Sequence, residues 1–198
     1  MNDFQQCLKD SHAAEDMPFW KEVYTTAFPN MVAMPNHRED GDHQRQGIDR
    51  SIILSNGKQL WIDEKVRKDD YGDIAIEYIS NDVYQTPGWA CKPLLSDYIA
   101  YAILPRHTCY LLPVPQLQLA WINKKTEWLQ RFGTKKAQNK TYNTLFCPVS
   151  IDVLFSAIGA CLRIGFKKIE EDETPEQQKT GMVQNKYCDI DNIDPYLF

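Results

Sequence analysis

The fold is decided by residues 47–65, which read GIDRSIILSNGKQLWIDEK. Two runs rich in apolar residues flank the segment Ser55-Asn56-Gly57-Lys58. An Asn-Gly pair between such runs is the strongest short signal for a β-hairpin. We therefore expect two antiparallel strands, at about residues 48–54 and 59–66, that fold back on each other at this pair.

The hairpin gathers charged side chains at its open end. Asp49 lies at the open end of the first strand, near Asp63 and Lys65 of the second. Because side chains alternate along a strand, Trp61, Asp63 and Lys65 share one face. Glu64 points to the other face and is not expected to join them. Two carboxylates and an ammonium can hold a hard divalent cation and activate a water beside it. The alternative is an ordinary exposed hairpin, in which Asp49 and Lys65 form an ion pair that contributes less than ~1 kcal/mol.

Asp49 and the Asp63-x-Lys65 pair resemble the core motif of the PD-(D/E)XK nucleases, the restriction-endonuclease-like superfamily. The resemblance covers roughly residues 47–113. It departs at Ile48, which stands where the proline of the family name would be. The resemblance implies an α/β fold with a mixed central sheet flanked by helices, in the core order αβββαβ. It also implies Mg²⁺- or Mn²⁺-dependent hydrolysis of phosphodiester bonds in DNA, with Asp49 and Asp63 as metal ligands and Lys65 assisting.

Glu77 is a further candidate ligand. It lies on an expected strand at 73–79 and reaches the same side as Asp63 if the two strands are neighbours. The alternative for Glu77 is an ordinary solvent-facing glutamate. His37 and His43 lie in the loop before the first hairpin strand, where they either contact the substrate or are simply exposed. The predicted catalytic residues are Asp49, Asp63, Lys65 and Glu77, and the predicted metal ligands are the three carboxylates among them.

The remaining sequence predicts helices and strands around this hairpin. Apolar residues at helical spacing predict helices, and Pro115 suits a first helical turn. The expected helices are 14–28, 92–104, 115–131 and 151–162, and the expected further strands are 73–79, 108–113 and 144–149. We expect residues 1–168 to form a single nuclease-like domain with an extra C-terminal helix. Residues 169–198 are expected to form an acidic, partly mobile tail.

The charges are unevenly distributed along the chain. The net charge of -5 argues at first sight against a nucleic-acid partner. However, residues 124–168 carry nine Lys or Arg against Glu127 and Asp152. Phosphate binding needs a locally positive surface and not a basic protein, although such a stretch can also be a solvated loop. The predicted contacts to DNA are Arg67, Lys92, Lys135, Lys136 and Lys140.

The composition of the chain indicates the cellular compartment of the protein and the class of function that it has. The chain has no run of eighteen apolar residues and no signal-peptide pattern at its N-terminus. Its six cysteines form no CxxC pair, so we expect reduced thiols in a cytoplasmic protein that does not enter a membrane. The resemblance allows a homodimer and an origin in a phage or mobile element. The alternative function class is a non-catalytic binding or inhibitor protein that retains the nuclease scaffold.

Overall fold

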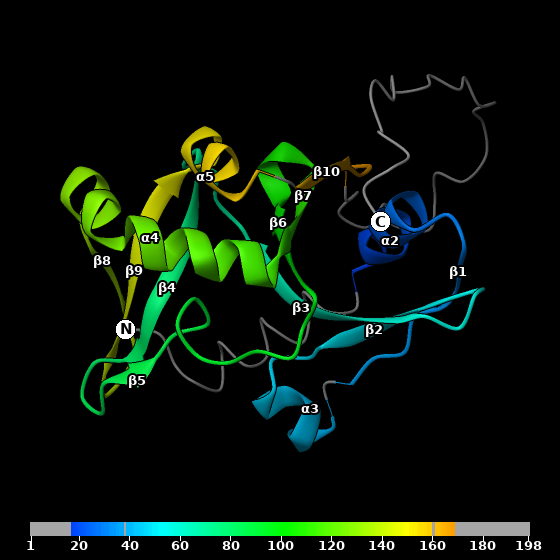
Figure 1. The fold of residues 1–198 in the computed structure, drawn as a ribbon, viewed down its shortest axis with the longest axis horizontal. Coiled ribbons are helices and arrows are strands. Elements are labelled where there is room, and N and C mark those ends of the chain that lie inside the picture. The colour runs from blue at the N-terminus through cyan, green and yellow to red at the C-terminus, as the bar shows by residue number, and fades with distance from the viewer. Residues whose placement is uncertain (1–16, 38, 160, 169–198) are drawn as a thin grey trace, which may run out of the picture. The chain divides into compact units, whose positions relative to one another are not determined.

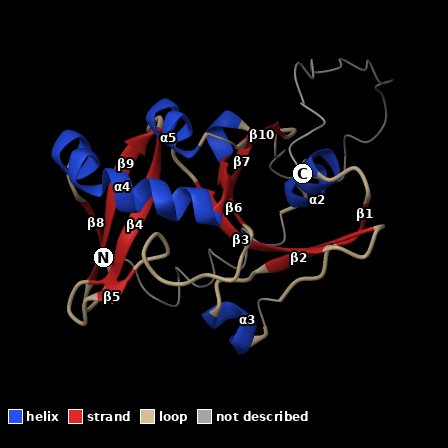
Figure 2. Ribbon diagram, in the orientation of Figure 1, coloured by secondary structure: helices blue, strands red, loops and turns tan. Residues whose placement is uncertain are grey.

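The computed structural model describes residues 17–37, 39–159 and 161–168 of the protein. The predicted acidic tail, 169–198, lies outside these described residues. The elements in chain order are α2 (Phe19–Ala27), β1 (Met31–Ala33), α3 (Gly41–Arg45), β2 (Arg50–Leu54), β3 (Gln59–Arg67), β4 (Asp73–Asn81), β5 (Thr86–Pro87), β6 (Tyr98–Ile103), the 3-10 helix η1 (Leu104–Arg106), β7 (Thr108–Pro113), α4 (Val114–Phe132), β8 (Lys135–Gln138), β9 (Asn143–Ser150), α5 (Ile151–Ile158) and β10 (Leu162–Gly165). The described chain is therefore of mixed α/β class, as the sequence predicts (Figures 1 and 2).

The strands form two sheets. The larger one has the order β1-β2-β3-β6-β7-β10 and the smaller one the order β5-β4-β9-β8. All pairings in the larger sheet are antiparallel except that between β3 and β6, which is parallel. Since every pairing in the smaller sheet is antiparallel, the mixed character comes from one strand pair, in the middle of the larger sheet.

The helices cover the sheets from different sides. Trp121 and Trp128 of α4, with Leu154 of α5, pack into one hydrophobic core together with residues of both sheets, including Ile76 and Ile99. Helix α2 instead packs beside β10, and its Tyr24 reaches Glu64 of β3 in the larger sheet (Figure 1). Its buried side chains include Phe19, which stacks on Phe166 just after β10, and Tyr24.

The predicted hairpin is confirmed as β2 and β3. The turn closes with a hydrogen bond from the Leu54 N–H to the Lys58 carbonyl, and the Asn56 side chain accepts from the Lys58 N–H. Gly57 has a φ of 82°, a left-handed conformation that suits glycine and explains why an Asn-Gly pair occupies this turn. The register pairs Arg50 with Ile62.

The predicted helix at 92–104 is wrong. Residues 98–103 form β6, which lies between β3 and β7, and five of its six residues are buried. A strand that is covered on both faces is apolar throughout, so its sequence lacks the alternation that marks a half-exposed strand. The strand predicted at 73–79 exists as β4 but belongs to the second sheet, so the order αβββαβ does not describe the chain as predicted.

Candidate active site

The side chains of Asp49 and Asp63 lie close together at the open end of the β2–β3 hairpin. The Asp63 carboxyl group interacts with that of Asp49 both through a hydrogen bond and through its charge. The Asp49 N–H donates to the Ile62 carbonyl at 2.9 Å. Asp49 Oδ2 accepts from the Glu64 N–H at 2.7 Å. The structure thus brings together the two carboxylates that the sequence predicts as neighbours.

Asp63 is buried and pairs with Lys65. Burial, together with the adjacent Asp49 carboxylate, raises the pKa of Asp63 to about 6, although the Lys65 ammonium acts in the opposite direction. Lys65 Nζ donates to Asp63 Oδ1, and the Lys65 side chain is 35% exposed. One cation therefore holds a pair of like charges together at a place that solvent reaches.

Lys65 interacts with three carboxylates. Burial acts to lower the pKa of Lys65, but the attraction of Asp63, Asp49 and Glu77 outweighs it, so the pKa is raised above its usual value. Lys65 is consequently charged at neutral pH. Glu77 lies near enough to act on Lys65 by its charge, although β4 belongs to the second sheet.

Glu77 is held by the loop that follows β5. Burial raises the pKa of Glu77, while Lys65, the Trp89 N–H and Lys92 act to lower it. The loop packs closely, because the Ala90 N–H donates to the Glu77 carbonyl at 3.0 Å. A Cβ at Gly88 would lie 2.5 Å from the same carbonyl oxygen, so only glycine fits there without a shift. Lys92, predicted to contact DNA, thus lies near Glu77.

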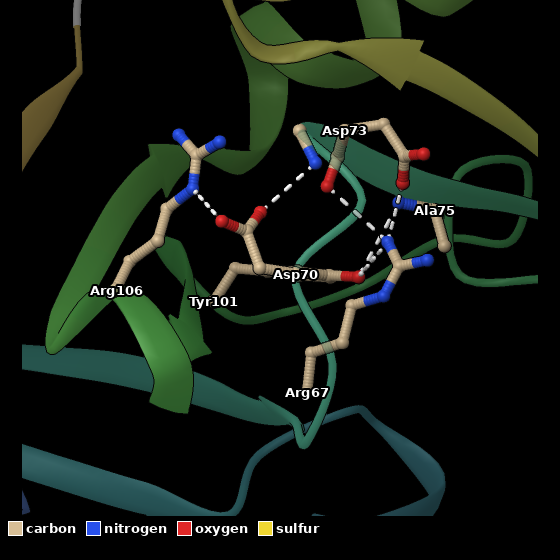
Figure 3. A network of polar contacts seen from close by, with 7 residues as sticks. Arg67, Asp70, Asp73, Ala75, Tyr101 and Arg106 are labelled. Atoms are coloured by element: carbon tan, nitrogen blue, oxygen red, sulfur yellow. Dashed lines mark hydrogen bonds and ion pairs between the residues drawn. The ribbon is translucent and has the colours of Figure 1, made fainter.

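The turn between β3 and β4 is fixed by two ion pairs, which Figure 3 shows. Arg67 pairs with Asp73 and donates to its carbonyl at 3.2 Å, while Arg106 Nε donates to Asp70 Oδ2 at 2.6 Å. Tyr101 on β6 joins the group, since its hydroxyl accepts from the Ala75 N–H at 3.3 Å. Arg67, predicted to contact DNA, is thus engaged in holding β4 against β6, and its role towards phosphate stays a prediction.

Glu64 lies on the opposite face of β3, as the alternation predicts. Its Oε1 accepts hydrogen bonds from the Tyr24 hydroxyl at 2.6 Å and from Arg50 Nε at 2.7 Å. All three side chains are buried. The burial of Glu64 is therefore satisfied by partners on α2 and β2, and the acidic side chain takes no part in the Asp49–Asp63 pair.

Two histidines and a tryptophan adjoin the acidic pair. The His37 N–H donates to the Asp49 carbonyl at 2.8 Å, and His37 Nε2 is hydrogen bonded to Ser51 Oγ at 2.9 Å. The rings of His37 and His43 are 4.5 Å apart, and each lies within 5.6 Å of Trp61, which shares the face of Asp63. Apart from the two histidines in a loop before the hairpin, nothing in the sequence indicates this cluster. An open pocket of about 790 Å³ beside it is lined by Asn36, His37, Glu39, Asp40 and Gly41.

The predicted lysine contacts on β8 are exposed. Lys135 pairs with Phe146 of β9, and Phe146 pairs with Glu77 of β4. Because directly paired residues point to the same side of a sheet, Lys135 shares a face with Glu77 at a distance of about 10 Å, two strand spacings. Lys136 points to the other face, and Lys140 lies in the turn that joins β8 to β9.

The candidate ligand side chains meet only some of the requirements of a metal site. Within the described residues, no group of three or more His, Cys, Asp or Glu side chains is arranged to hold a metal ion. Mg²⁺ does not need such a cage, because it is usually bound by one or two carboxylates together with waters and substrate phosphates. Asp49 and Asp63 fit this smaller role, since two interacting carboxylates, one of them buried, are stabilised by a cation. Glu77 as a third ligand stays a prediction.

Comparison with protein-family models, with curated proteins and with solved structures finds no match to this chain. In the part of the chain that the structure describes, no helix is both long and apolar enough to cross a membrane. The Asp49–Asp63–Lys65 cluster is therefore the feature of this chain that best indicates a function.

Proposed function

We propose that this protein is a Mg²⁺- or Mn²⁺-dependent nuclease that hydrolyses phosphodiester bonds of DNA. The observation that carries the proposal is the pair of interacting carboxylates, Asp49 and Asp63, with the Lys65 ammonium bound to Asp63 at a partly exposed position. A purely structural ion pair needs one carboxylate for one lysine. Here two carboxylates and the nearby Glu77 compete for a single cation.

The fold supports the restriction-endonuclease-like part of the proposal. A helix, α2, is followed by β1, β2 and β3, which form three consecutive antiparallel strands of one sheet. The next strand of that sheet, β6, is parallel to β3. The segment between β3 and β6 contains β5 and also β4, the predicted third strand of the core, which belongs to the smaller sheet. On this interpretation, the second sheet is an elaboration inserted into the core.

The side chains have separable roles in the proposed reaction. A bound Mg²⁺ would neutralise charge that develops on the phosphate and lower the pKa of a coordinated water. Asp49 and Asp63 would hold the cation. With a cation held by the two aspartates, Lys65 would be able to donate a hydrogen bond from Nζ to a phosphate oxygen and so stabilise the added negative charge of the transition state.

The proposal is tested with Asp63→Asn, which removes a negative ligand without changing the shape of the side chain. We expect the wild type to cleave DNA with Mg²⁺ or Mn²⁺ and to be inactive in EDTA. The variant should lose both cleavage and the binding of Mn²⁺ measured by calorimetry in the absence of DNA. The matched control is Asp152→Asn, an aspartate in the first turn of α5.

Two results would argue against a nuclease. Wild-type cleavage by a folded Asp63→Asn variant would place the active site elsewhere. DNA binding by a wild-type protein that neither cleaves nor takes up Mn²⁺ would instead favour a non-catalytic binding protein that retains the scaffold.

A further inference from the structure

Two hairpin turns of the smaller sheet are clamped together. One turn joins β4 to β5 and the other joins β8 to β9. Asp82 in the first turn accepts from the backbone N–H of Asn143 at 2.7 Å and from its side-chain amide at 2.8 Å, and donates its own N–H to the Asn143 carbonyl at 3.0 Å. Three hydrogen bonds between one residue pair fix the two turns side by side.

The first turn is built to present side chains rigidly. Asn81 Oδ1 accepts from the N–H groups of both Val83 and Tyr84, at 3.0 and 3.1 Å. Gln85 has a φ of 52°, a left-handed conformation that is uncommon for residues other than glycine. Its side-chain amide donates to the Asp82 carbonyl at 2.5 Å. The turn is therefore closed by its own polar side chains and does not depend on burying the apolar ones.

The apolar side chains of this turn project into solvent. Tyr84 is 81% exposed and Val83 is 62% exposed. An exposed aromatic ring on a rigid turn costs no folding energy to present and is available for stacking. The adjacent strand and turn supply positive charge. Residues 133–144 contain Lys135, Lys136 and Lys140 and no acidic residue, and Lys136 lies close enough to Asp82 to interact with it.

We propose that the clamped turns bind a single strand of nucleic acid, with Tyr84 stacked on an unpaired base and Lys136 and Lys140 contacting the flanking phosphates. An anionic partner is indicated because the second clamped turn and its strand carry lysines and no acidic residue, and because Lys136 lies near the Asp82 carboxylate, whose oxygens accept from Asn143. An aromatic ring among lysines is the combination that single-stranded nucleic acids require, since every base offers a face for stacking and every linkage a phosphate.

The inference rests on the proposed nuclease function and specifies its substrate. Glu77 lies four residues before Asn81 on the same strand, a distance of about 14 Å. That distance corresponds to roughly four stacked nucleotides. A single strand of a few nucleotides that stacks on Tyr84 would therefore extend along β4 towards Glu77, which interacts with Lys65. The substrate class is a single strand, or a duplex with an unpaired tail, and not an intact duplex.

The test measures affinity for a fluorescent single-stranded oligonucleotide in EDTA, where cleavage cannot occur. Tyr84→Ala should weaken binding by roughly 5- to 150-fold, the range for loss of one stacked base. Tyr84→Phe keeps the ring and should bind like the wild type. The matched control is Tyr71→Ala, because Tyr71 is also 68% exposed but lies in the turn between β3 and β4. It should bind within twofold of the wild type.

The same variants are then measured with a blunt duplex, for which Tyr84→Ala should change affinity less than twofold. An unchanged affinity of Tyr84→Ala for the single strand would overturn the proposal, as would an equal loss for the duplex. These results are independent of the nuclease proposal, because Asp63→Asn tests cleavage and metal uptake, whereas Tyr84→Ala tests binding without a metal.

Discussion

Lys65 lies among the carboxylates of Asp63, Asp49 and Glu77, and it forms a direct ion pair with the first of them. Its attraction lowers the pKa of Asp63, which burial and Asp49 together raise. At the scale of single residues, Lys65 therefore has two roles. It keeps a buried acid ionised near neutral pH, and it places an ammonium where a phosphate would approach the acidic pair.

The variant Lys65→Ala distinguishes a role of Lys65 in catalysis from a role in a surface ion pair alone. If Lys65 contacts the phosphate or the attacking water, turnover should fall by roughly 10²–10³-fold, as for removal of one preorganised donor. Because the lysine no longer lowers the pKa of Asp63, that pKa should rise above about 6. Activity that needs the ionised acid should then begin at a higher pH. A pH–rate profile measures both effects.

The control for this variant is Lys58→Ala, at the closed end of the same hairpin. It should keep wild-type turnover and the wild-type pH profile. Unchanged turnover in Lys65→Ala would mean that Lys65 is only an ion-pair partner of Asp63 and has no role in the reaction.

The residue scale is also where the sequence was most informative. Alternation along one strand and the register of an Asn-Gly hairpin are enough to place Asp49, Asp63 and Lys65 together and to send Glu64 to the other face. The partner of Arg67 could not be predicted in this way. Asp73 lies beyond a turn whose geometry depends on two ion pairs, one of them formed by the distant Arg106.

At the scale of elements, the position of Glu77 depends on close packing between β4 and the loop after β5. Gly88 lies against the Glu77 backbone and side chain, which a Cβ would approach to 2.5 and 2.7 Å. Gly88→Ala should therefore push the loop away from β4. We expect a loss of stability of about 1–3 kcal/mol, the usual cost of overpacking, measured by chemical denaturation.

The matched control is Gly165→Ala on β10, where the nearest atom to a new Cβ would be 3.9 Å away. This variant should unfold within about 1 kcal/mol of the wild type, because an unobstructed strand position tolerates alanine. Gly88→Ala with wild-type stability would mean that the loop can move away from β4 without cost, and that Glu77 is not fixed by it.

The elements were predicted unevenly, for a physical reason. Helix α4 and the hairpin strands carry strong periodic signals, and both were found within a few residues of their bounds. Strand β6 was taken for a helix because burial on both sides removes the period-two pattern. Strands β1 and β10, of three and four residues, are too short to carry a pattern and exist because their neighbours offer free edges.

At the scale of the whole molecule, the net charge of -5 coexists with a locally basic sheet edge. Strand β8 forms that edge, and all four of its residues are exposed. Lys135 lies on the face of Glu77, while Lys136 and Lys140 lie beside the clamped turns. A substrate that runs from the acidic pair to Tyr84 would pass these side chains, so we expect its binding to depend on salt through them.

Replacing Lys135, Lys136 and Lys140 with Gln should flatten that dependence. Each phosphate of a single strand that the protein contacts contributes about -0.7 to the slope of log affinity against log salt, so the triple variant should lose up to about two units of slope.

The control removes equal charge from α4, as Lys124→Gln, Lys125→Gln and Arg131→Gln. Because these three side chains belong to a helix and not to β8 or the clamped turns, their triple variant should keep the wild-type slope. Fluorescence anisotropy across a salt series in EDTA measures both. Equal slopes in the wild type and the β8 variant would mean that the basic edge faces solvent and that the strand is held elsewhere.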